Sequence, residues 1–386
     1  MREFRVLYVD CYTVLDSKNS QVPSSMSIGY GVTAGRVIRR ALESHGIRLV
    51  RPLAGSLPED GNLRAARLKW VLRGYQAIAD AVIAERPDIV FVFHSFSTFP
   101  AEIRRILLEL DSPIPILGYT HGSHWDPSDS LRTERYPGLK ILDLANLAAL
   151  DRILFDSEFM KRIVVDGVGE MSEAVSREIA QKSRVVGLPL DTGFIDSCRP
   201  ERSYRRTTVV FNHAPVAAKD PAEFARVIGP LMARFDINVI FTRAFDPGDP
   251  GAAEVRELRE TFGERVILGQ DMSLDEYFQA LWMSDIQVST ALHESLGMAT
   301  LEAMYTQNCC LLPSRGSYPE ICGDNQAALY NSSAELTERL AHYITQDAER
   351  HALAKALAEQ AGRYTEPEVM PRILAAIEEL AVAARG

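Results

Sequence analysis

The stretch Ser289-Thr-Ala-Leu-His-Glu-Ser-Leu-Gly-Met-Ala-Thr-Leu-Glu-Ala-Met304 follows a short apolar run and opens into a helical pattern. A strand that ends at Ser289, a turn that carries Glu294 and a helix that starts near Ser295 or Leu296 would direct several backbone N–H groups to one spot. A helix start of this kind binds anions, because its first amides have no partner within the helix and the helix dipole favours negative charge there. The stretch therefore predicts an anion site between a strand and a helix.

The same order of a short apolar run, a turn and a longer amphipathic segment recurs along both halves of the chain, which is typical of βα units in a parallel sheet. In the first half the predicted strands are Arg5–Val9, Ile47–Arg51, Asp88–Phe93, Ile114–Tyr119, Arg152–Phe155 and Ser183–Val186. In the second half they are Thr207–Phe211, Asn238–Thr242, Arg265–Leu268, Ile286–Ser289 and Cys309–Leu312. We predict an α/β chain with two doubly wound, Rossmann-like sheets.

A domain boundary is predicted at Cys198 to Arg206, a short charged segment that contains Pro200. The length of 386 residues suits two domains better than one. We expect a first domain over residues 1–198, a second over residues 207–364 and a final segment over residues 365–386. The final segment has the apolar stripe of an amphipathic helix, made of Val369, Ile373, Leu374, Ile377, Leu380 and Ala381.

Composition narrows the class of protein. The formal net charge of -10 gives no overall electrostatic reason to bind nucleic acid or an anionic membrane. No run of 18 apolar residues is present, so we expect no integral membrane association. The cysteines, Cys11, Cys198, Cys309, Cys310 and Cys322, are odd in number and form no Cys-x-x-Cys pair, which argues against a disulfide framework or a zinc site. We expect a cytoplasmic protein.

The chemistry that best suits the anion site is the departure of a diphosphate. Negative charge develops on a diphosphate when a glycosidic bond breaks, and helix N-terminal amides stabilise that charge. Gly297 would let the backbone approach the diphosphate, and the carboxylate of Glu302 could accept hydrogen bonds from ribose hydroxyls. Glu294, in the turn, could contact the sugar or the positive charge that develops at its anomeric carbon.

Two glutamates seven residues apart, with Ser295-Leu-Gly after the first and Ala-Met after the second, resemble the signature of the family 4 retaining glycosyltransferases. Gly316-Ser-Tyr-Pro-Glu320 is similar to that family's Gly-Gly-x-Pro-Glu turn, whereas Ser295 and Leu296 depart from its usual glycine and aromatic residue. The resemblance implies the GT-B fold, in which two Rossmann-like domains face a central cleft and the terminal helix packs back on the first domain. It also implies Glu294 at the donor sugar, Ser295 to Gly297 at the diphosphate and Glu302 at the ribose.

The strand predicted at Thr207–Phe211 leads into a second candidate segment, Phe211-Asn-His-Ala-Pro-Val-Ala-Ala-Lys219. Proteins of this fold place a basic pair here that holds the diphosphate, and Lys219 matches its lysine. Ala214 stands near the place of the expected arginine, so Arg243, at the end of the next strand, is the substitute that we consider. The remaining candidates for the donor site are Asn212 and His293.

In the first half the strongest candidate is His121, within Tyr119-Thr-His-Gly-Ser-His-Trp-Asp126 at the end of a predicted strand. In the transferases that this chain resembles, a histidine at this strand end contacts the donor sugar or helps to position the acceptor, which implies that role for His121, with His124 and Asp126 as second choices. The glycines of Gly29-Tyr-Gly31 could let the chain approach a phosphate or the acceptor.

These features predict a retaining hexosyltransferase that uses a nucleoside-diphosphate sugar as co-substrate, with no cofactor. No Asp-x-Asp tripeptide is present, and the family resemblance implies no metal. A narrower resemblance, to the tRNA-queuosine mannosyltransferase branch, rests on Asn146-Leu-Ala-Ala-Leu150, Phe155-Asp-Ser-Glu-Phe159 and Lys219-Asp-Pro221, and implies GDP-mannose and tRNA. The acceptor therefore stays open among a small molecule, a glycan and tRNA. The same two-domain pattern would also suit a noncatalytic sugar-nucleotide binding protein, an epimerase or a glycosidic phosphorylase.

Overall fold

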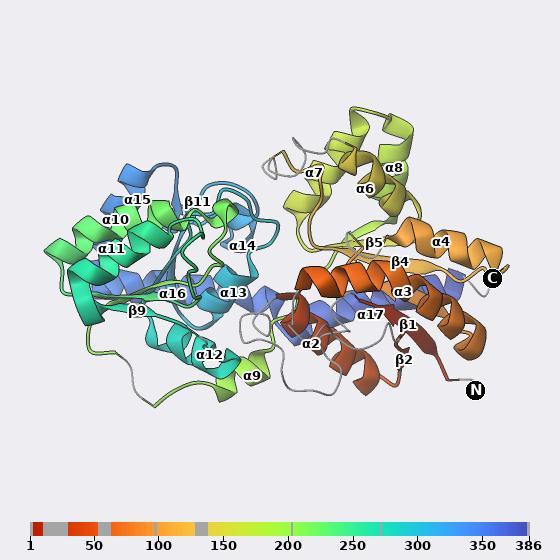
Figure 1. Cartoon of the computed structure of the whole chain (residues 1–386), viewed down its shortest axis with the longest axis horizontal. Helices are drawn as coiled ribbons and strands as arrows, with labels where there is room; N and C mark the ends of the chain where they lie inside the picture. The colour runs from red at the N-terminus through yellow and green to blue at the C-terminus, as the bar shows by residue number, and fades with distance from the viewer. Residues whose placement is uncertain are drawn as a thin grey trace. The chain divides into compact units, whose positions relative to one another are not determined.

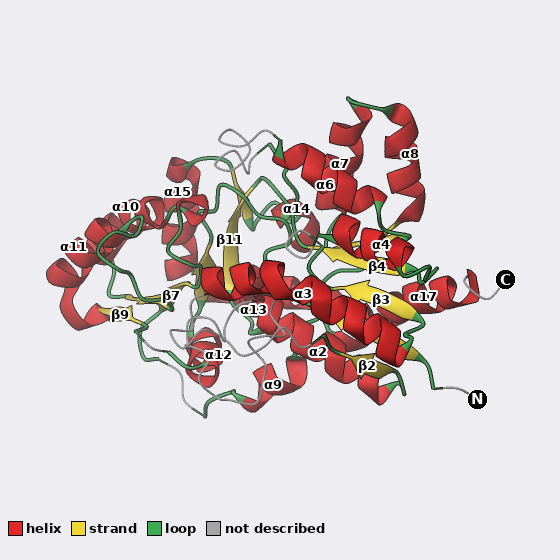
Figure 2. Cartoon of the chain, turned by 45° about the vertical axis from the view of Figure 1, so that its right-hand side comes forward, coloured by secondary structure: helices red, strands yellow, loops and turns green. Residues whose placement is uncertain are grey.

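The computed structural model describes residues 3–10, 30–52, 63–95, 99–127, 138–201, 204–270 and 272–383. Contacts divide the chain into two compact units, one of residues 1–189 with 366–386 and the other of residues 190–365. Figure 1 labels the elements of both units, and Figure 2 shows the strands of each sheet between helices. Each unit is thus built as an α/β layer structure.

The first unit alternates strands with helices. Its strands are β1 (Arg5–Val9), β2 (Arg48–Val50), β3 (Ile89–Val92), β4 (Ile116–Thr120), β5 (Arg152–Phe155) and β6 (Ser183–Val185). Its helices are α2 (Tyr30–Ser44), α3 (Leu63–Glu85), α4 (Pro100–Glu109), α6 (Leu139–Ala148), α7 (Glu158–Gly169), α8 (Glu173–Lys182) and α17 (Glu366–Ala383). The strand order is β2-β1-β3-β4-β5-β6, with parallel pairing throughout.

The second unit repeats this plan. Its strands are β7 (Thr208–Phe211), β8 (Asn238–Phe241), β9 (Val266–Leu268), β10 (Ile286–Val288), β11 (Cys309–Pro313) and β12 (Leu329–Tyr330). Its α-helices are α9 (Thr192–Ser197), α10 (Pro221–Arg234), α11 (Ala252–Phe262), α12 (Leu274–Met283), α13 (Met298–Tyr305), α14 (Tyr318–Ile321), α15 (Ser333–Thr345) and α16 (Asp347–Ala361). The parallel strand order, β12-β11-β10-β7-β8-β9, is that of a Rossmann sheet.

The strands form where the sequence has continuous apolar runs, because helices cover both faces of a parallel sheet. All residues of β3, β4, β7 and β8 are buried. Local signals fix the helix starts: Ser273 and Glu276 form a capping box at α12, and Asp220 caps α10 ahead of Pro221. The two sheets and their parallel strands agree with the predicted fold.

The division between the units falls between Pro189 and Leu190, before the boundary that we predicted at Cys198 to Arg206. The reason is that α9 packs on the second unit: the indole Nε1 of Trp282 donates to the Ile195 carbonyl at 2.9 Å. The rings of Phe194 and Phe278 lie 5.9 Å apart. The final helix, α17, lies in the first unit against α2, β3 and β5.

Candidate active site

The strand order of the second unit places β7 and β10 side by side at the point where the order along the sheet reverses. Open α/β sheets bind ligands outside the carboxyl ends of their strands at such a point. Asn212 and His213 directly follow β7, and Ser289 directly follows β10. Both segments that the sequence singled out in this half therefore start at the same edge of the sheet.

The residues after β10 form a turn that ends in α13. Gly297 caps this helix with a φ of 91°, a left-handed conformation that glycine adopts without strain. The helix starts at Met298, so the start predicted near Ser295 or Leu296 is wrong by one turn or less. Leu296 is buried with its side chain in the core rather than exposed on the helix. Among the described residues, no side chain caps the first amides of α13.

Lys219 and Glu294 form the central ion pair of this turn. The Lys219 Nζ lies 2.6 Å from the Glu294 Oε2 and 3.2 Å from the His293 carbonyl oxygen. Backbone contacts hold the two segments together, since the Leu292 N–H donates to the Ala218 carbonyl at 2.8 Å. The Thr290 hydroxyl lies 2.9 Å from the Lys219 carbonyl. The structure therefore joins two residues that the sequence placed 75 positions apart.

The protein environment acts on Glu294 in two opposing directions. Burial is the largest single effect and would raise the pKa of the carboxyl, but the charge and hydrogen bond of Lys219, together with His213 and His293, lower the pKa below its ordinary value. The neighbouring His213 is buried, which lowers its pKa to about 3, and Lys219 adds to that shift. At neutral pH the site thus holds a carboxylate, an ammonium and an uncharged imidazole.

Glu302, on α13, is the centre of a buried polar network. The Tyr277 hydroxyl donates to the Glu302 Oε2 at 2.5 Å, and the Asn212 amide donates to the Tyr277 oxygen at 3.2 Å and to the Ala299 carbonyl at 2.6 Å. Gln287 in turn donates to the Asn212 Oδ1 at 3.2 Å. Burial raises the pKa of Glu302 to about 7, although Tyr277 and Arg243 act against the shift.

Arg243 lies on the edge of this network, with its guanidinium carbon 5.7 Å from the centre of the Tyr277 ring. Its charge reaches both Glu302 and His213, because it contributes to the pKa shift of each. Ser295 and His293 are partly exposed on the turn between β10 and α13. Lys219, Glu294 and His293 thus make direct contacts, whereas Arg243 joins the group through Tyr277 and Glu302.

His121 lies in the first unit, directly after β4. The ring stacks on Tyr119 with centroids 4.6 Å apart, and its Nε2 lies 2.8 Å from the Phe93 carbonyl oxygen. A carbonyl can only accept, so Nε2 carries the proton and Nδ1 holds the lone pair. Burial lowers the pKa of His121 to about 3, which keeps the ring neutral.

The other first-unit candidates have different surroundings. The backbone N–H of His124 donates to the Asp143 Oδ2 at 3.0 Å, and the Ser123 hydroxyl donates to the same oxygen at 2.5 Å, so Asp143 holds this loop in place. Asp126 is 1% exposed. Gly31 lies in the first turn of α2, and Gly29 lies outside the described residues.

Three residues of this region were not predicted from the sequence as site residues: His213, Tyr277 and Tyr318. His213 could have been found from its place after β7, because the ends of parallel strands are common positions for functional groups. Tyr277 and Tyr318 are buried at 1% and 0% exposure and approach the two glutamates from distant segments. A tyrosine in an apolar helix pattern gives no such indication.

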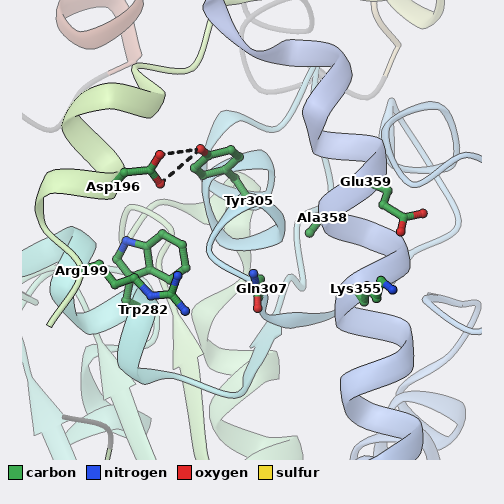
Figure 3. A pocket seen from close by; sticks show the side chains of 8 residues that line it. All are labelled: Asp196, Arg199, Trp282, Tyr305, Gln307, Lys355, Ala358 and Glu359. Carbon is green, nitrogen blue, oxygen red and sulfur yellow. Dashed lines mark hydrogen bonds between the residues drawn. The ribbon is translucent and has the colours of Figure 1, made fainter. Parts of the chain in front are cut away.

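A cavity of about 540 Å³ in the second unit contains none of the predicted site residues. Figure 3 shows its lining, in which the Arg199 guanidinium lies 4.6 Å from the centre of the Trp282 ring and the Tyr305 hydroxyl contacts the Asp196 carboxylate. Lys355 and Glu359 of α16 form the opposite wall. The Lys219–Glu294 ion pair and the start of α13 lie instead at the β7–β10 edge.

In the part of the chain that the structure describes, no three His, Cys, Asp or Glu side chains are grouped to hold a metal ion. Within the same described residues, no helix is both long enough and apolar enough to cross a bilayer. Of the five cysteines, Cys198, Cys309, Cys310 and Cys322 are buried free thiols, and Cys11 lies outside the described residues.

No protein-family model matches the chain. A stretch of 90 residues is 33% identical to the tRNA-queuosine alpha-mannosyltransferase of Drosophila melanogaster. This match covers 23% of the chain and 23% of the Drosophila protein. The chain thus aligns with less than a quarter of the length of this relative.

Solved structures match over nearly the whole chain. The alpha,alpha-trehalose-phosphate synthase (UDP-forming) of Burkholderia vietnamiensis has a TM-score of 0.74 at 14% identity, over 99% of this chain and 100% of that one. The sucrose-phosphate synthase of Thermosynechococcus elongatus has a TM-score of 0.69 at 13% identity, over 99% and 100%. A trehalose-6-phosphate protein from E. coli, bound with UDP-2-fluoro glucose, has a TM-score of 0.69 at 12% identity, over 98% and 99%. The chain therefore has the GT-B fold that the sequence predicted.

Proposed function

We propose that the protein is a retaining, metal-independent glycosyltransferase, which transfers a hexose from a nucleoside-diphosphate sugar to an acceptor hydroxyl. The observation that carries this proposal is the Lys219–Glu294 pair, 2.6 Å apart, beside the uncapped start of α13 at the reversal point of the second sheet. A cation and free amides together suit a diphosphate, and the carboxylate suits a sugar. The GT-B fold and a neighbour that binds UDP-2-fluoro glucose support it.

In the reaction that we propose, the bond between the anomeric carbon and the diphosphate oxygen breaks while the acceptor oxygen bonds to the same carbon from the same face. Lys219 and the amides of α13 stabilise the negative charge on the departing diphosphate. The acceptor proton passes to the oxygen of the leaving group, so no protein base is needed, and attack from the same face retains the configuration. Glu294 lies at the sugar and Glu302 at the ribose, with Ser295, Gly297 and Arg243 near the diphosphate.

Glu302 fits the role of a ribose ligand only if the donor reaches the edge of its buried network. Its Oε2 already accepts from Tyr277, so a ribose hydroxyl would bind Oε1 or replace that partner. A shifted pKa close to 7 also means that a nearby hydroxyl can serve either as donor or as acceptor. His121, neutral with its lone pair on Nδ1, could accept a hydrogen bond from a sugar hydroxyl. We place it with the sugar or the acceptor.

A narrower candidate is a mannosyltransferase that uses GDP-mannose and modifies queuosine in tRNA. The 33% identity over 90 residues to the Drosophila tRNA-queuosine enzyme favours it. The net charge of -10 offers no general attraction for tRNA, so binding would depend on local contacts. The buried free thiols support a reducing compartment such as the cytoplasm.

The test starts with thermal shifts in the presence of GDP-, UDP-, ADP- and dTDP-sugars, since a ligand that binds the native state raises its stability. The donor that binds is then incubated with candidate acceptors, and NMR determines the anomeric configuration of the product. We expect an α-linked donor to give an α-linked product. We expect Lys219→Met to lower turnover at least about 100-fold, and the exposed Lys355→Met to leave it unchanged.

Each candidate function predicts a different result. A noncatalytic sugar-nucleotide binding protein would show the thermal shift but neither transfer nor slow hydrolysis of the donor. An inverted product would contradict the retaining mechanism. A protein that binds no nucleotide sugar would contradict the whole proposal. Transfer that needs GDP-mannose and queuosine-containing tRNA would identify the narrower candidate.

A further inference from the structure

The turn of residues 315–318 contacts both the main chain and the side chain of Glu294. The backbone N–H of Ser317 lies 3.4 Å from the Glu294 carbonyl oxygen, and the Tyr318 hydroxyl lies 3.3 Å from its Oε2. Lys219 and Tyr318 therefore both donate to Oε2 of the same carboxylate. Ser317 thus binds the main chain of Glu294, and the neighbouring Tyr318 binds its side chain.

Two glycines make these contacts possible. A Cβ on Gly316 would lie 2.9 Å from the Glu294 carbonyl oxygen, closer than real Cβ atoms approach. A Cβ on Gly297 would lie 3.3 Å from the Glu294 Cγ and 3.4 Å from the Tyr318 Cε1. Both glycines have positive φ values, 60° and 91°. The backbone on both sides of Glu294 is therefore shaped so that Tyr318 can reach the carboxylate.

A second hydrogen bond, with Ser289, holds the hydroxyl of Tyr318 in place. It lies 2.6 Å from the Ser289 Oγ, which accepts from the Ala291 N–H at 3.3 Å. The carboxylate of Glu294 can only accept a hydrogen bond. The hydroxyls of Ser289 and Tyr318 therefore both have an acceptor when Ser289 donates to Tyr318 and Tyr318 donates to Glu294. Tyr330 in turn holds Ser289 in place, because the Tyr330 hydroxyl donates to the Ser289 carbonyl at 2.6 Å. Tyr318 is 0% exposed, so its hydroxyl is shielded from bulk solvent.

We propose that Tyr318 is a positioning residue, which orients the Glu294 carboxylate for the donor sugar through its hydroxyl. This inference rests on the proposed function. With Oε2 bound by Lys219 and Tyr318, the carboxylate cannot rotate freely, and Oε1 is the oxygen left to face the sugar. The position that the family turn Gly-Gly-x-Pro-Glu leaves variable therefore carries, in this chain, a side chain that acts on the first glutamate of the motif.

The test compares Tyr318→Phe, which removes one oxygen atom, with Tyr305→Phe as its matched control. The Tyr305 hydroxyl also donates to a carboxylate, that of Asp196, at 3.0 Å, but neither residue lies at the donor site. We expect Tyr318→Phe to lower the kcat for donor turnover about 10-fold to 100-fold, since it removes a hydrogen bond to a charged group. The affinity for the nucleoside diphosphate alone should change less than about 3-fold, because that ligand lacks the sugar. Tyr305→Phe should match the wild type in both.

A second measurement separates positioning from simple packing. Besides Tyr318, which contacts the carboxylate, the titratable groups that act most on Glu294 are Lys219, His213 and His293. Selective ¹³C labelling of glutamate carboxyls, with Glu294→Gln for assignment, gives the pKa of Glu294 directly. Loss of the Tyr318 donor should raise that pKa and move the acidic limb of the kcat profile to higher pH by the same amount.

The outcomes are distinct. An unchanged kcat and an unchanged Glu294 titration in Tyr318→Phe would overturn the inference. A lower kcat without any shift in the Glu294 titration would overturn it too, since the effect would then come from packing. If the wild type binds no nucleotide sugar, the proposed function fails, and the titration still decides whether Tyr318 holds the carboxylate.

Discussion

Glu302 is held near the midpoint of its titration at neutral pH, because burial raises its pKa to about 7 from an ordinary value of 4.5. Between these two pH values the folded state binds more protons than the unfolded state. The free energy of unfolding therefore falls as the pH rises through this range, by at most about 1.4 kcal/mol per pH unit. The contribution of Glu302 is most favourable below pH 4.5 and is fully lost above pH 7.

Glu302→Gln fixes this side chain in a neutral form and removes its titration. We expect the variant to gain stability relative to the wild type as the pH rises from about 5 to about 8, in urea unfolding at several pH values. His121 and His213, whose pKa values lie near 3, act in the opposite direction between about pH 3 and 6.5, but equally in both proteins. The exposed Glu359→Gln is the control. A stability difference that does not depend on pH would contradict the prediction.

For single residues, the sequence indicated the charged residues of the site but not the tyrosines that contact them. The turn before the predicted helix indicated Glu294, and the resemblance to proteins of this fold indicated Lys219; the structure joins the two in an ion pair. Tyr277 and Tyr318 could not be proposed, because they lie 25 and 24 positions along the chain from the glutamates that they contact. The roles of Glu302 at the ribose and of His121 at the sugar stay predictions.

The turn between β10 and α13 depends on a backbone conformation that side chains disfavour. Gly297 has a φ of 91°, and an added Cβ would lie 3.3 Å from the Glu294 Cγ and 3.4 Å from the Ile321 Cδ1. Gly297→Ala should therefore lower the free energy of unfolding by about 1–3 kcal/mol, through backbone strain and crowding. Urea unfolding measures the loss.

The matched control is Gly248→Ala, in an exposed loop of the same unit where an added Cβ would meet no atom within 4 Å. This variant should stay within about 0.5 kcal/mol of the wild type. Equal stability of the two alanine variants would mean that the left-handed turn at Gly297 is not required.

Elements were predictable wherever the pattern was strong. Each predicted strand is present, because most strands of a covered parallel sheet are apolar runs, although β2, β6 and β10 include polar residues. The two residues of β12 are too few to give such a run. The start of α13 was placed too early, because Ser295 and Leu296 are acceptable helix residues and only the backbone of Gly297 shows where the turn ends.

At the scale of the whole molecule, the first unit combines residues 1–189 with the last segment of the chain, residues 366–386. Residues 366–386 leave the second unit and complete the first, where α17 contacts α2, β3 and β5. Surface ion pairs add to the contact: the Arg152 Nη2 lies 2.9 Å from a Glu379 oxygen, and the Arg40 Nη2 lies 2.5 Å from a Glu366 oxygen. The apolar stripe predicted this helix, but pattern alone does not say which sheet a helix covers.

If α17 completes the first unit, then a charge on its buried face should weaken that unit specifically. Ile373 is 0% exposed, and Ile373→Asp would bury an unpaired carboxylate in place of an apolar side chain, at a cost of about 3 kcal/mol or more. Val382, on the same helix, is 73% exposed, so Val382→Asp should cost less than about 0.5 kcal/mol. Hydrogen exchange with mass spectrometry should show faster exchange in β1, β3 and β5 of Ile373→Asp, and unchanged exchange in β7, β8 and β10. Equal loss of protection in both sheets would mean that the two units unfold together, and no loss in either would mean that α17 contributes nothing to the first.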